Sequence, residues 1–487
     1  MNYRKLHANT HLSCEVVSIG QMGCSYMGTL SLDEHSVALF DVVDVDMDFY
    51  HRIKEMKDFI ICAKTSSDCI TLWGTTIIEV KFHTHSKVQI CFWISDIFVG
   101  SEYAIEQNAD ILFSGFSCRF TDLFELLGLY PYKVENVGSE WEFKSVTIAD
   151  STKTMEFDNG YSCFVTPYVY KKDNDYIFSM QGRLNYVASE LENITELKEK
   201  IRMLELFLEI LCGETVTVLD VTLDKRDSIF EYIGLCNYPK NKLKGLSNGM
   251  DSKWYPRKSI FKLSDWNDTG KNVIELFAEL ARNNVLAMES YKQVLLDEEI
   301  KIVTYNKFLK IMQMIEGIMR DPVLQQEMDD FNNKKREVLA KIEADEVKSF
   351  IKKYCVNNGE SFRKCLKKIT RECLRVLSDA GTDKIFENYD KLITKIINDR
   401  DAYTHALQGR EPVMNEEEIN LVNCCYKEFF RIIVLEKLGI SEKLIRTRFL
   451  FNRKFVDSYK ILFGLAITNV DEKHNTGEFD DDMCDYV

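Results

Sequence analysis

Two residues in the C-terminal half of the sequence have the types and spacing needed to act on a phosphate group. His405 is the single histidine between residues 86 and 473, and Arg400 precedes it with four residues in between. An imidazole has a pKa near neutrality and can move a proton. A planar guanidinium binds a phosphate and stabilises the charge that builds on its oxygens. The same pair also fits a structural role, with Arg400 in an ion pair beside a packed histidine.

The surroundings of Arg400 make it the better candidate of two matching pairs. Arg4 and His11 are separated by six residues, but they precede predicted strands. Arg400 instead continues the apolar stripe of a predicted helix at 383–408, where a guanidinium needs an anion, a carboxylate or a partner chain. At about 3.6 residues per turn, residues five apart point roughly 140° away from each other. One phosphate can contact both side chains only if the helix distorts or the side chains converge. Otherwise a second chain has to supply the partner residue.

A predicted helix at 361–379 carries a basic face. Its basic residues recur at three- and four-residue spacing, and they are Arg363, Lys364, Lys367, Lys368, Arg371 and Arg375. The opposite apolar stripe consists of Phe362, Leu366, Ile369, Cys373 and Leu377, as expected for an amphipathic helix. The basic face would suit the phosphates of a nucleic acid. Alternatively, it is the solvated face of a bundle helix.

The periodicity along the chain predicts an α+β multidomain protein. A β-rich N-terminal half, sandwich-like or barrel-like, precedes an all-α antiparallel helical bundle. Gly74 separates two strand-like runs and marks a hairpin turn or a bulge. A helix begins near Asn193 and stops at Gly213. The further predicted elements are strands at 215–222 and 228–235, a loop at 239–257, and helices at 322–355, 361–379, 383–408, 414–438 and 441–462.

These patterns divide the chain into four parts. We predict a β-rich N-terminal domain at 1–190 and a mixed helix and strand region at 191–300 that belongs to the N-terminal half. A helical domain follows at 301–470, and an acidic tail at 471–487.

Charge is distributed unevenly over the 487 residues. The net charge of −15 combines −15 in residues 1–300, +6 in residues 301–470 and −6 in residues 471–487. A basic helical segment is a pointer to a polyanionic partner, although an ordinary solvated helical surface has the same composition.

Several classes of protein are disfavoured by what the sequence lacks. No apolar run is long enough to span a membrane and no signal peptide is readable, so we expect a cytoplasmic location. None of the fifteen cysteines forms a C-x-x-C pair, which predicts reduced thiols and no metal site. The motifs of phosphate-binding loops, dinucleotide sites, zinc proteases and α/β-hydrolases are absent.

The segment from Arg400 to His405 resembles the R-x4–6-H motif of the HEPN superfamily, many of whose members are metal-independent ribonucleases. The run from Asn306 to Glu316 is similar to the opening helix of HEPN domains of the ApeA type. A β-rich region, here with the run 70–74 (Ile-Thr-Leu-Trp-Gly), ahead of a HEPN domain also resembles ApeA-type anti-phage proteins. The chain departs from the family at Asp401, because asparagine more often follows the arginine.

This resemblance implies a homodimeric or larger endoribonuclease that uses no cofactor. It implies cleavage of RNA, with tRNA as one candidate, through the 2′-OH to a 2′,3′-cyclic phosphate. Arg400 would bind the phosphate and His405 would be the general base or acid, with Asp401, Tyr403 and Glu316 in support. The N-terminal half would sense a phage-derived trigger or restrain the nuclease in abortive infection.

Two other classes of function stay open. One is a HEPN-like module that binds RNA or protein without cleaving, which Asp401 favours. The other is an adaptor whose helical half only forms oligomers.

Overall fold

The structure, a computed structural model, describes residues 11–32, 38–56, 59–83, 86–104, 111–121, 123–127, 132–137, 140–145, 153–157, 159–172, 175–225, 228–234, 261–266, 272–299, 304–320, 322–354, 361–377, 386–405 and 412–463. The described residues fall into two compact units. The first holds 11–208, 216–234 and 262–264, and the second holds 209–215, 261 and 265–463.

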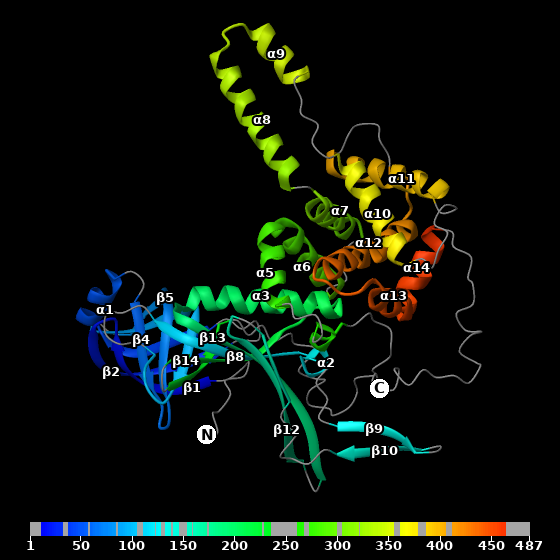
Figure 1. Ribbon diagram of the computed structural model, residues 1–487. Helices are drawn as coiled ribbons and strands as arrows, with labels where there is room; N and C mark the ends of the chain where they lie inside the picture. Colours follow the sequence, from blue (N-terminus) through cyan, green and yellow to red (C-terminus); the bar gives the residue numbers. More distant parts are fainter. Residues whose placement is uncertain are drawn as a thin grey trace. The chain divides into compact units, whose positions relative to one another are not determined.

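The first unit is built on a closed barrel of short antiparallel strands (Figure 1). Within the described part of the chain, six strands pair in the cyclic order β5-β4-β1-β2-β3-β6, and β6 returns to β5. They are β1 (His11–Ile19), β2 (Met22–Leu32), β3 (Ala38–Asp46), β4 (Phe59–Lys64), β5 (Cys69–Phe82) and β6 (Lys87–Ile94). Alternate residues such as Val16, Phe40 and Phe92 are buried in its core, as the two-residue period of a strand requires. Helix α1 (Met47–Lys54) follows β3.

Gly74 lies at a bulge in β5, where the sheet divides. Residues 69–73 of β5 pair with β7 (Asp96–Gly100), and residues 76–82 pair with β6. Gly74 has a φ of +62°, and a Cβ there would lie 2.1 Å from the Ser95 Oγ. Glycine alone meets both demands without strain. The two runs around Gly74 therefore form one strand, and of the two interpretations offered by the sequence the bulge is confirmed and the hairpin turn is wrong.

The sheet continues from β7 beyond the barrel. Its further strands follow in the order β15, β14, β8, β13, β12 and β11, all antiparallel. Their bounds are β8 (Leu112–Phe120), β11 (Lys153–Glu156), β12 (Tyr161–Lys172), β13 (Asp175–Asn193), β14 (Val218–Lys225) and β15 (Ser228–Ile233). A separate hairpin pairs β9 (Tyr132–Val137) with β10 (Glu140–Ser145), and a short helix, α2 (Leu123–Leu127), follows β8. The predicted β-rich, barrel-like N-terminal half is confirmed.

Helix α3 (Ile194–Cys212) begins and ends where its sequence signals lie. The Asn193 side chain accepts from the N–H of Glu196 at 3.0 Å, and the Glu196 carboxylate accepts from the N–H of Asn193 at 3.1 Å, which is a capping box. Gly213, with a φ of +75°, ends the helix and donates its N–H to the carbonyl of Glu209. The predicted start and stop of this helix are confirmed.

The second unit is helical (Figure 1). After the 3-10 turn Leu263–Trp266, its helices are α5 (Val273–Asn283), α6 (Val285–Glu299), α7 (Thr304–Met319), α8 (Pro322–Lys341), α9 (Asp345–Tyr354), α10 (Phe362–Leu377), α11 (Phe386–His405), α12 (Glu416–Lys437), α13 (Glu442–Phe451) and α14 (Arg453–Phe463). Helix α12 is central and contacts α7, α10, α13 and α14. The predicted all-α bundle is confirmed, and α8 and α9 extend away from its other helices.

Two predicted helices are each divided in the structure. The segment 322–355 forms α8 and α9, because Asp345 and Glu346 place two carboxylates in a new first turn, where the helix dipole favours them. The segment 441–462 forms α13 and α14, because the Asn452 side chain accepts from the N–H of Phe455 and caps α14. The predicted loop at 239–257 and the acidic tail lie outside the described residues.

Candidate active site

Helix α11 carries Arg400 on the edge of its buried stripe. Tyr389, Ile393 and Ile396 are buried, and α11 packs against α7 and α10. Arg400 follows Ile396 by one helical turn, so its side chain leaves the helix toward the same neighbours. It is 26% exposed. A charged group in that position has to be paired, and the structure shows its partner.

The partner is Glu316 on α7. The Arg400 Nη2 donates to the Glu316 Oε2 at 3.0 Å, and the aromatic ring of Phe362, the first residue of α10, lies 4.7 Å from the guanidinium carbon. The Arg400 Nη1 lies 3.6 Å from the Asp401 Oδ1, which is within ion-pair distance. A guanidinium has five N–H donors, so these contacts fix its orientation and leave further donors for an anion.

Glu316 binds a second arginine as well. Arg320, one turn further along α7, donates to the Glu316 Oε1. The side chain of Glu316 is 18% exposed and that of Arg320 is 39% exposed. Because its two oxygens bind two different guanidinium groups, Glu316 is held in place from both sides. It can therefore orient Arg400 rather than move with it.

Tyr403 is packed against α7. Its ring centroid lies 4.9 Å from that of Tyr305 and 6.2 Å from that of Phe308. Burial, with Tyr305 and Asp399 nearby, raises the pKa of Tyr403 above its usual value. The phenol therefore stays neutral, and in this arrangement the ring supports the start of α7.

Asp399, which the sequence analysis did not single out, holds the segment that follows α11. Its side chain is fully buried, and its oxygens accept from the N–H groups of Val413 at 2.6 Å and Met414 at 3.0 Å. A carboxylate that accepts two backbone N–H groups links the end of α11 to the beginning of α12. Its place three residues after Ile396, on the core side of the helical period, was the available signal.

His405 is the last residue of α11, and its side chain lies outside the described residues. The helix is continuous from Phe386 to His405. Positions 400 and 405 of this helix are therefore roughly 140° apart around its axis. In the other matching pair, His11 begins β1 and Arg4 lies outside the described residues.

Helix α10 lies next to α11 (Figure 1), and its basic residues are exposed apart from the half-buried Lys367. Arg363 donates to the Thr394 Oγ1 at 3.3 and 3.4 Å. The remaining partners are acidic: Asp390 for Lys367 at 2.5 Å, and Glu436 and Glu442 for Arg375 at 2.8 and 2.6 Å. Lys364, Lys368 and Arg371 are exposed and form no ion pair with any described residue. The predicted apolar stripe is confirmed, with all five of its residues buried.

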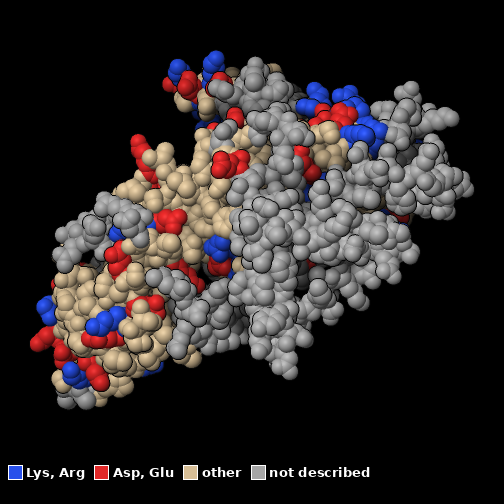
Figure 2. Space-filling view, turned by 60° about the horizontal axis from the view of Figure 1, so that its bottom comes forward, with Lys and Arg blue, Asp and Glu red and all other residues tan. Residues whose placement is uncertain are grey.

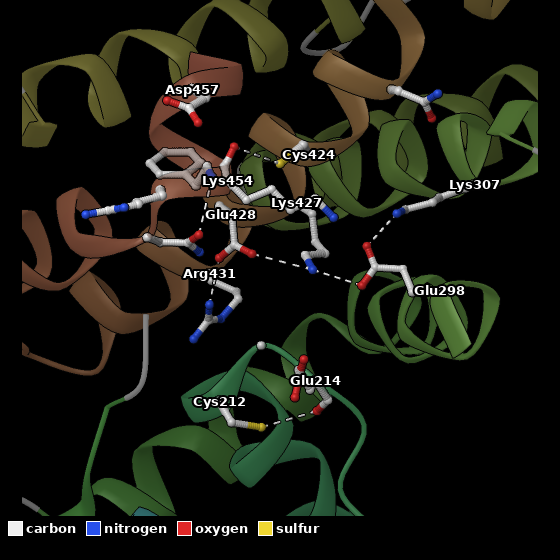
Figure 3. Close-up of a pocket in the computed structure, with 15 residues that line it drawn as sticks. Cys212, Glu214, Glu298, Lys307, Cys424, Lys427, Glu428, Arg431, Lys454 and Asp457 are labelled. Carbon is white, nitrogen blue, oxygen red and sulfur yellow. Dashed lines mark hydrogen bonds and ion pairs between the residues drawn. The ribbon is translucent and has the colours of Figure 1, made fainter. Parts of the chain in front are cut away.

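A cavity of about 870 Å³ lies elsewhere in the helical unit. Its wall holds a chain of alternating charges, in which Lys307 binds Glu298, Glu298 binds Lys427 at 2.9 Å, and Lys427 lies 3.5 Å from Glu428 (Figure 3). The chain ends at Arg431, which donates to Glu428 at 2.6 Å. None of the predicted site residues lines this cavity.

Arg431 connects this ion chain to the end of α3. Its guanidinium is 1% exposed and donates to the carbonyls of Ile210 at 2.8 Å and Leu211 at 2.9 Å. Burial acts to lower the pKa of Lys427, but Glu428 and Glu298 outweigh it and raise that pKa above its usual value. The buried cations of the cavity are thus already matched by carboxylates and carbonyls, which points to a role in stability.

Charges of both signs are interspersed on the surface seen in Figure 2. Among the described residues, no three histidine, cysteine or acidic side chains gather as a metal-binding group. No helix in the described part of the chain has the length and apolar character to cross a membrane.

Two protein-family models match the chain, one in its helical part and one in its β-rich part. Residues 309–444, which contain Glu316, Phe362, Arg400 and His405, match the family model described as Apea-like HEPN. This part of the helical unit is thus a HEPN domain. Residues 25–275, more than half of the chain, match the model of ApeA N-terminal domain 1. The chain belongs to the ApeA-like family of HEPN proteins, and the resemblance seen in the sequence is confirmed. No curated protein and no solved structure matches it.

Proposed function

We propose that this protein is an endoribonuclease that cleaves RNA without a metal ion, with Arg400 and His405 as its catalytic residues. The observation that carries the proposal is the pairing of Arg400 with Glu316. In a HEPN domain, this pairing presents a half-buried, oriented guanidinium five residues before the histidine of the R-x4-H motif. Such a group is suited to a phosphate that gains negative charge in the transition state.

The chemistry needs little beyond these residues, because RNA supplies its own nucleophile. His405 as general base removes the proton of the 2′-OH, and the 2′ oxygen attacks the adjacent phosphorus. Arg400 binds the non-bridging oxygens as negative charge builds on them. The bond to the 5′ oxygen breaks, and that oxygen takes up a proton. The products are a 2′,3′-cyclic phosphate and a 5′-OH end.

We infer that the active site is shared between two copies of the chain. Positions 400 and 405 lie about 140° apart around one continuous helix, so a single phosphate is better served by Arg400 of one copy and a histidine of the second. The proposed protein is therefore a homodimer, or a larger oligomer, that associates through its HEPN domain.

The proposed biological role is anti-phage defence in the cytoplasm. Cleavage of RNA, with tRNA as the candidate substrate, would halt translation in an infected cell and cause abortive infection. A nuclease that acts on its own cell needs restraint. We assign that task to the β-rich N-terminal half, which would respond to a phage-derived trigger or inhibitor.

The direct test is incubation of total cellular RNA in EDTA with the purified wild-type chain and its His405→Ala and Arg400→Ala variants. The proposal expects wild-type fragments that end in a cyclic phosphate. Loss of either group should slow the reaction by at least about a hundredfold, while circular dichroism shows that folding is intact. If the wild type is silent, the assay is repeated with lysate from phage-infected cells. Equal background in all three proteins under both conditions would contradict the proposal.

A second candidate function is an inactive HEPN-like module that binds RNA or protein, or that drives oligomerisation. Asp401 favours it, because its carboxylate lies 3.6 Å from the Arg400 Nη1 and competes with a phosphate for the same guanidinium. This alternative predicts measurable RNA affinity without turnover. The Asp401→Asn variant separates the two functions, because it should bind RNA more tightly in either case but cleave it faster only if the protein is a nuclease.

A further inference from the structure

The six basic residues of α10 differ in what they contact, and only part of the basic face is available to a ligand. Building on the proposed function, we propose that Lys364, Lys368 and Arg371, here called the outer stripe, bind the phosphates of single-stranded RNA next to the phosphate held by Arg400. The other three basic residues then serve the packing of the bundle.

The outer stripe occupies the centre of the exposed side of α10. At about 100° per residue, its three side chains fall within roughly 60° of arc. All three are exposed and form no ion pair with any described residue. No described carboxylate compensates their charges, and side chains at four- and three-residue spacing form one row along a helix.

The remaining basic residues face neighbouring helices. Arg363 and Lys367 lie on the side of α10 that meets α11, where Thr394 and Asp390 bind them. Arg375, in the last turn, bridges to α12 and α13 through Glu436 and Glu442. RNA would have to compete with two carboxylates to bind Arg375 and with one to bind Lys367. Lys367 and Arg375 therefore offer less to a polyanion than the outer stripe does, while Arg363 is bound by the Thr394 hydroxyl and not by a described carboxylate.

The position of α10 connects the outer stripe to the reaction centre. Phe362, which contacts the Arg400 guanidinium, is only two residues before Lys364. Helices α10 and α11 run antiparallel, since Phe362 meets Arg400 while Lys367 meets Asp390. The row therefore begins at the end of α10 that meets Arg400, on the face opposite Phe362, and extends away from that end over about 10 Å, at about 1.5 Å per residue. A strand whose scissile phosphate sits on Arg400 would pass around the first turn of α10 and place its following phosphates along this row.

Two charge-matched triple variants of the full-length chain test the inference. The first carries Lys364→Gln, Lys368→Gln and Arg371→Gln, and the control carries Arg363→Gln, Lys367→Gln and Arg375→Gln. Both lose three positive charges from the same helix. Each is made together with His405→Ala so that RNA is not consumed. Binding of a labelled single-stranded RNA is measured by fluorescence anisotropy over a series of salt concentrations, with circular dichroism as the check on folding.

The outer-stripe variant should bind RNA at least about tenfold more weakly. Its plot of log K against log salt concentration should become less steep by about 2, because each lost phosphate contact on single-stranded RNA removes roughly 0.7. The control variant should keep most of the affinity and most of the slope. Equal losses in the two variants would mean that binding follows net charge alone, and would overturn the inference. An unchanged slope in the outer-stripe variant would do the same.

A competitor separates RNA from an acidic protein partner. Polyglutamate with the same number of charges as the RNA should displace it poorly, and equally efficient displacement would assign the outer stripe to an acidic polypeptide instead. The binding readout is independent of cleavage. If the wild-type chain binds RNA through the outer stripe but never cleaves it, the proposed function is refuted and this inference is not. If the wild-type chain cleaves RNA and both triple variants lose RNA affinity equally, this inference is refuted and the proposed function is not.

Discussion

The interactions of Arg400 define what the site can do at the scale of single residues. Its guanidinium is oriented by Glu316, rests on Phe362 and lies near Asp401. Glu316 is itself held by Arg320, so in the proposed reaction it would orient Arg400 without acting on the substrate. Glu316 is thus a positioning residue in the proposed reaction.

Glu316→Gln should lower kcat by about 10- to 100-fold, because a charged hydrogen bond contributes about 1.5–3 kcal/mol and the amide cannot accept from two arginines through two oxygens. KM for RNA should not rise, since Arg400 is released for the phosphate rather than removed. Arg320→Gln, which removes only the outer contact of Glu316, should change kcat by less than about threefold. Steady-state kinetics on a defined RNA checks this. A Glu316→Gln variant with unchanged kcat, or with a raised KM alone, would refute the positioning role.

The sequence predicted part of this site. The core-facing stripe of α11 required an anionic partner for Arg400, and Glu316 was among the residues named. Asp399 was missed because a buried carboxylate that binds backbone N–H groups depends on where the chain after α11 returns, which no local pattern encodes. The packing of Tyr403 against Tyr305 and Phe308 likewise depends on how α7 meets α11.

At the scale of elements, a chain of buried and half-buried charges joins helices of the second unit. Lys307 on α7, Glu298 on α6, and Lys427, Glu428 and Arg431 on α12 alternate in sign. Arg431 ends the chain on the carbonyls that α3 leaves unbonded at its C-terminus. Removing one member of such a buried chain leaves its partners without compensation.

Arg431→Met should destabilise the helical unit by about 3–5 kcal/mol, because Glu428 and the Ile210 carbonyl lose their buried donor and the Leu211 carbonyl keeps only the N–H of Phe261. Arg375→Met is the matched control. That arginine also binds two carboxylates, but it is exposed, and its loss should cost less than about 1 kcal/mol. Urea unfolding followed by the helical circular dichroism signal gives both values. Equal losses of unfolding free energy in the two variants would show that the burial of Arg431 contributes nothing to stability.

The same ion chain predicts a response to acid. Burial acts to raise the pKa of Glu298, but Lys427 and Lys307 outweigh it and hold that pKa below its usual value. A depressed carboxyl pKa contributes stability above the unfolded value of about 4.3, and that stability is lost as pH falls through the folded value. Glu298→Gln should therefore be less stable than wild type at pH 7 and lose less stability below about pH 5. Glu343→Gln, at an exposed position between α8 and α9, should follow the wild-type curve. If the stability of Glu298→Gln falls with decreasing pH as steeply as that of the wild type, the expectation is contradicted.

Element types were largely readable from the sequence, and element boundaries less so. The cap at Asn193 and the stop at Gly213 are local signals, and both were predicted. The division of two helices at 342–344 and at Asn452 was not, because helical periodicity continues across both places and only capping chemistry breaks it. The pairing order of the strands also escaped prediction, since it depends on contacts far apart in the sequence.

At the scale of the whole molecule, the chain combines an ApeA N-terminal domain with a HEPN domain. In the proposed function a single copy is insufficient, because positions 400 and 405 lie about 140° apart around the axis of α11. The central claim is that two copies complete each other, with Arg400 of one and His405 of the second acting on one phosphate.

Mixing two inactive variants tests that claim most directly. Arg400→Ala and His405→Ala chains are co-expressed under separate tags, the mixed dimer is purified through both tags, and its cleavage of RNA is measured in EDTA. The mixed dimer retains one intact arginine and one intact histidine on different chains, so we predict that it regains up to about half of the wild-type rate, while each variant alone stays inactive. A mixed dimer as inactive as its parents, beside an active wild type, would contradict the shared site.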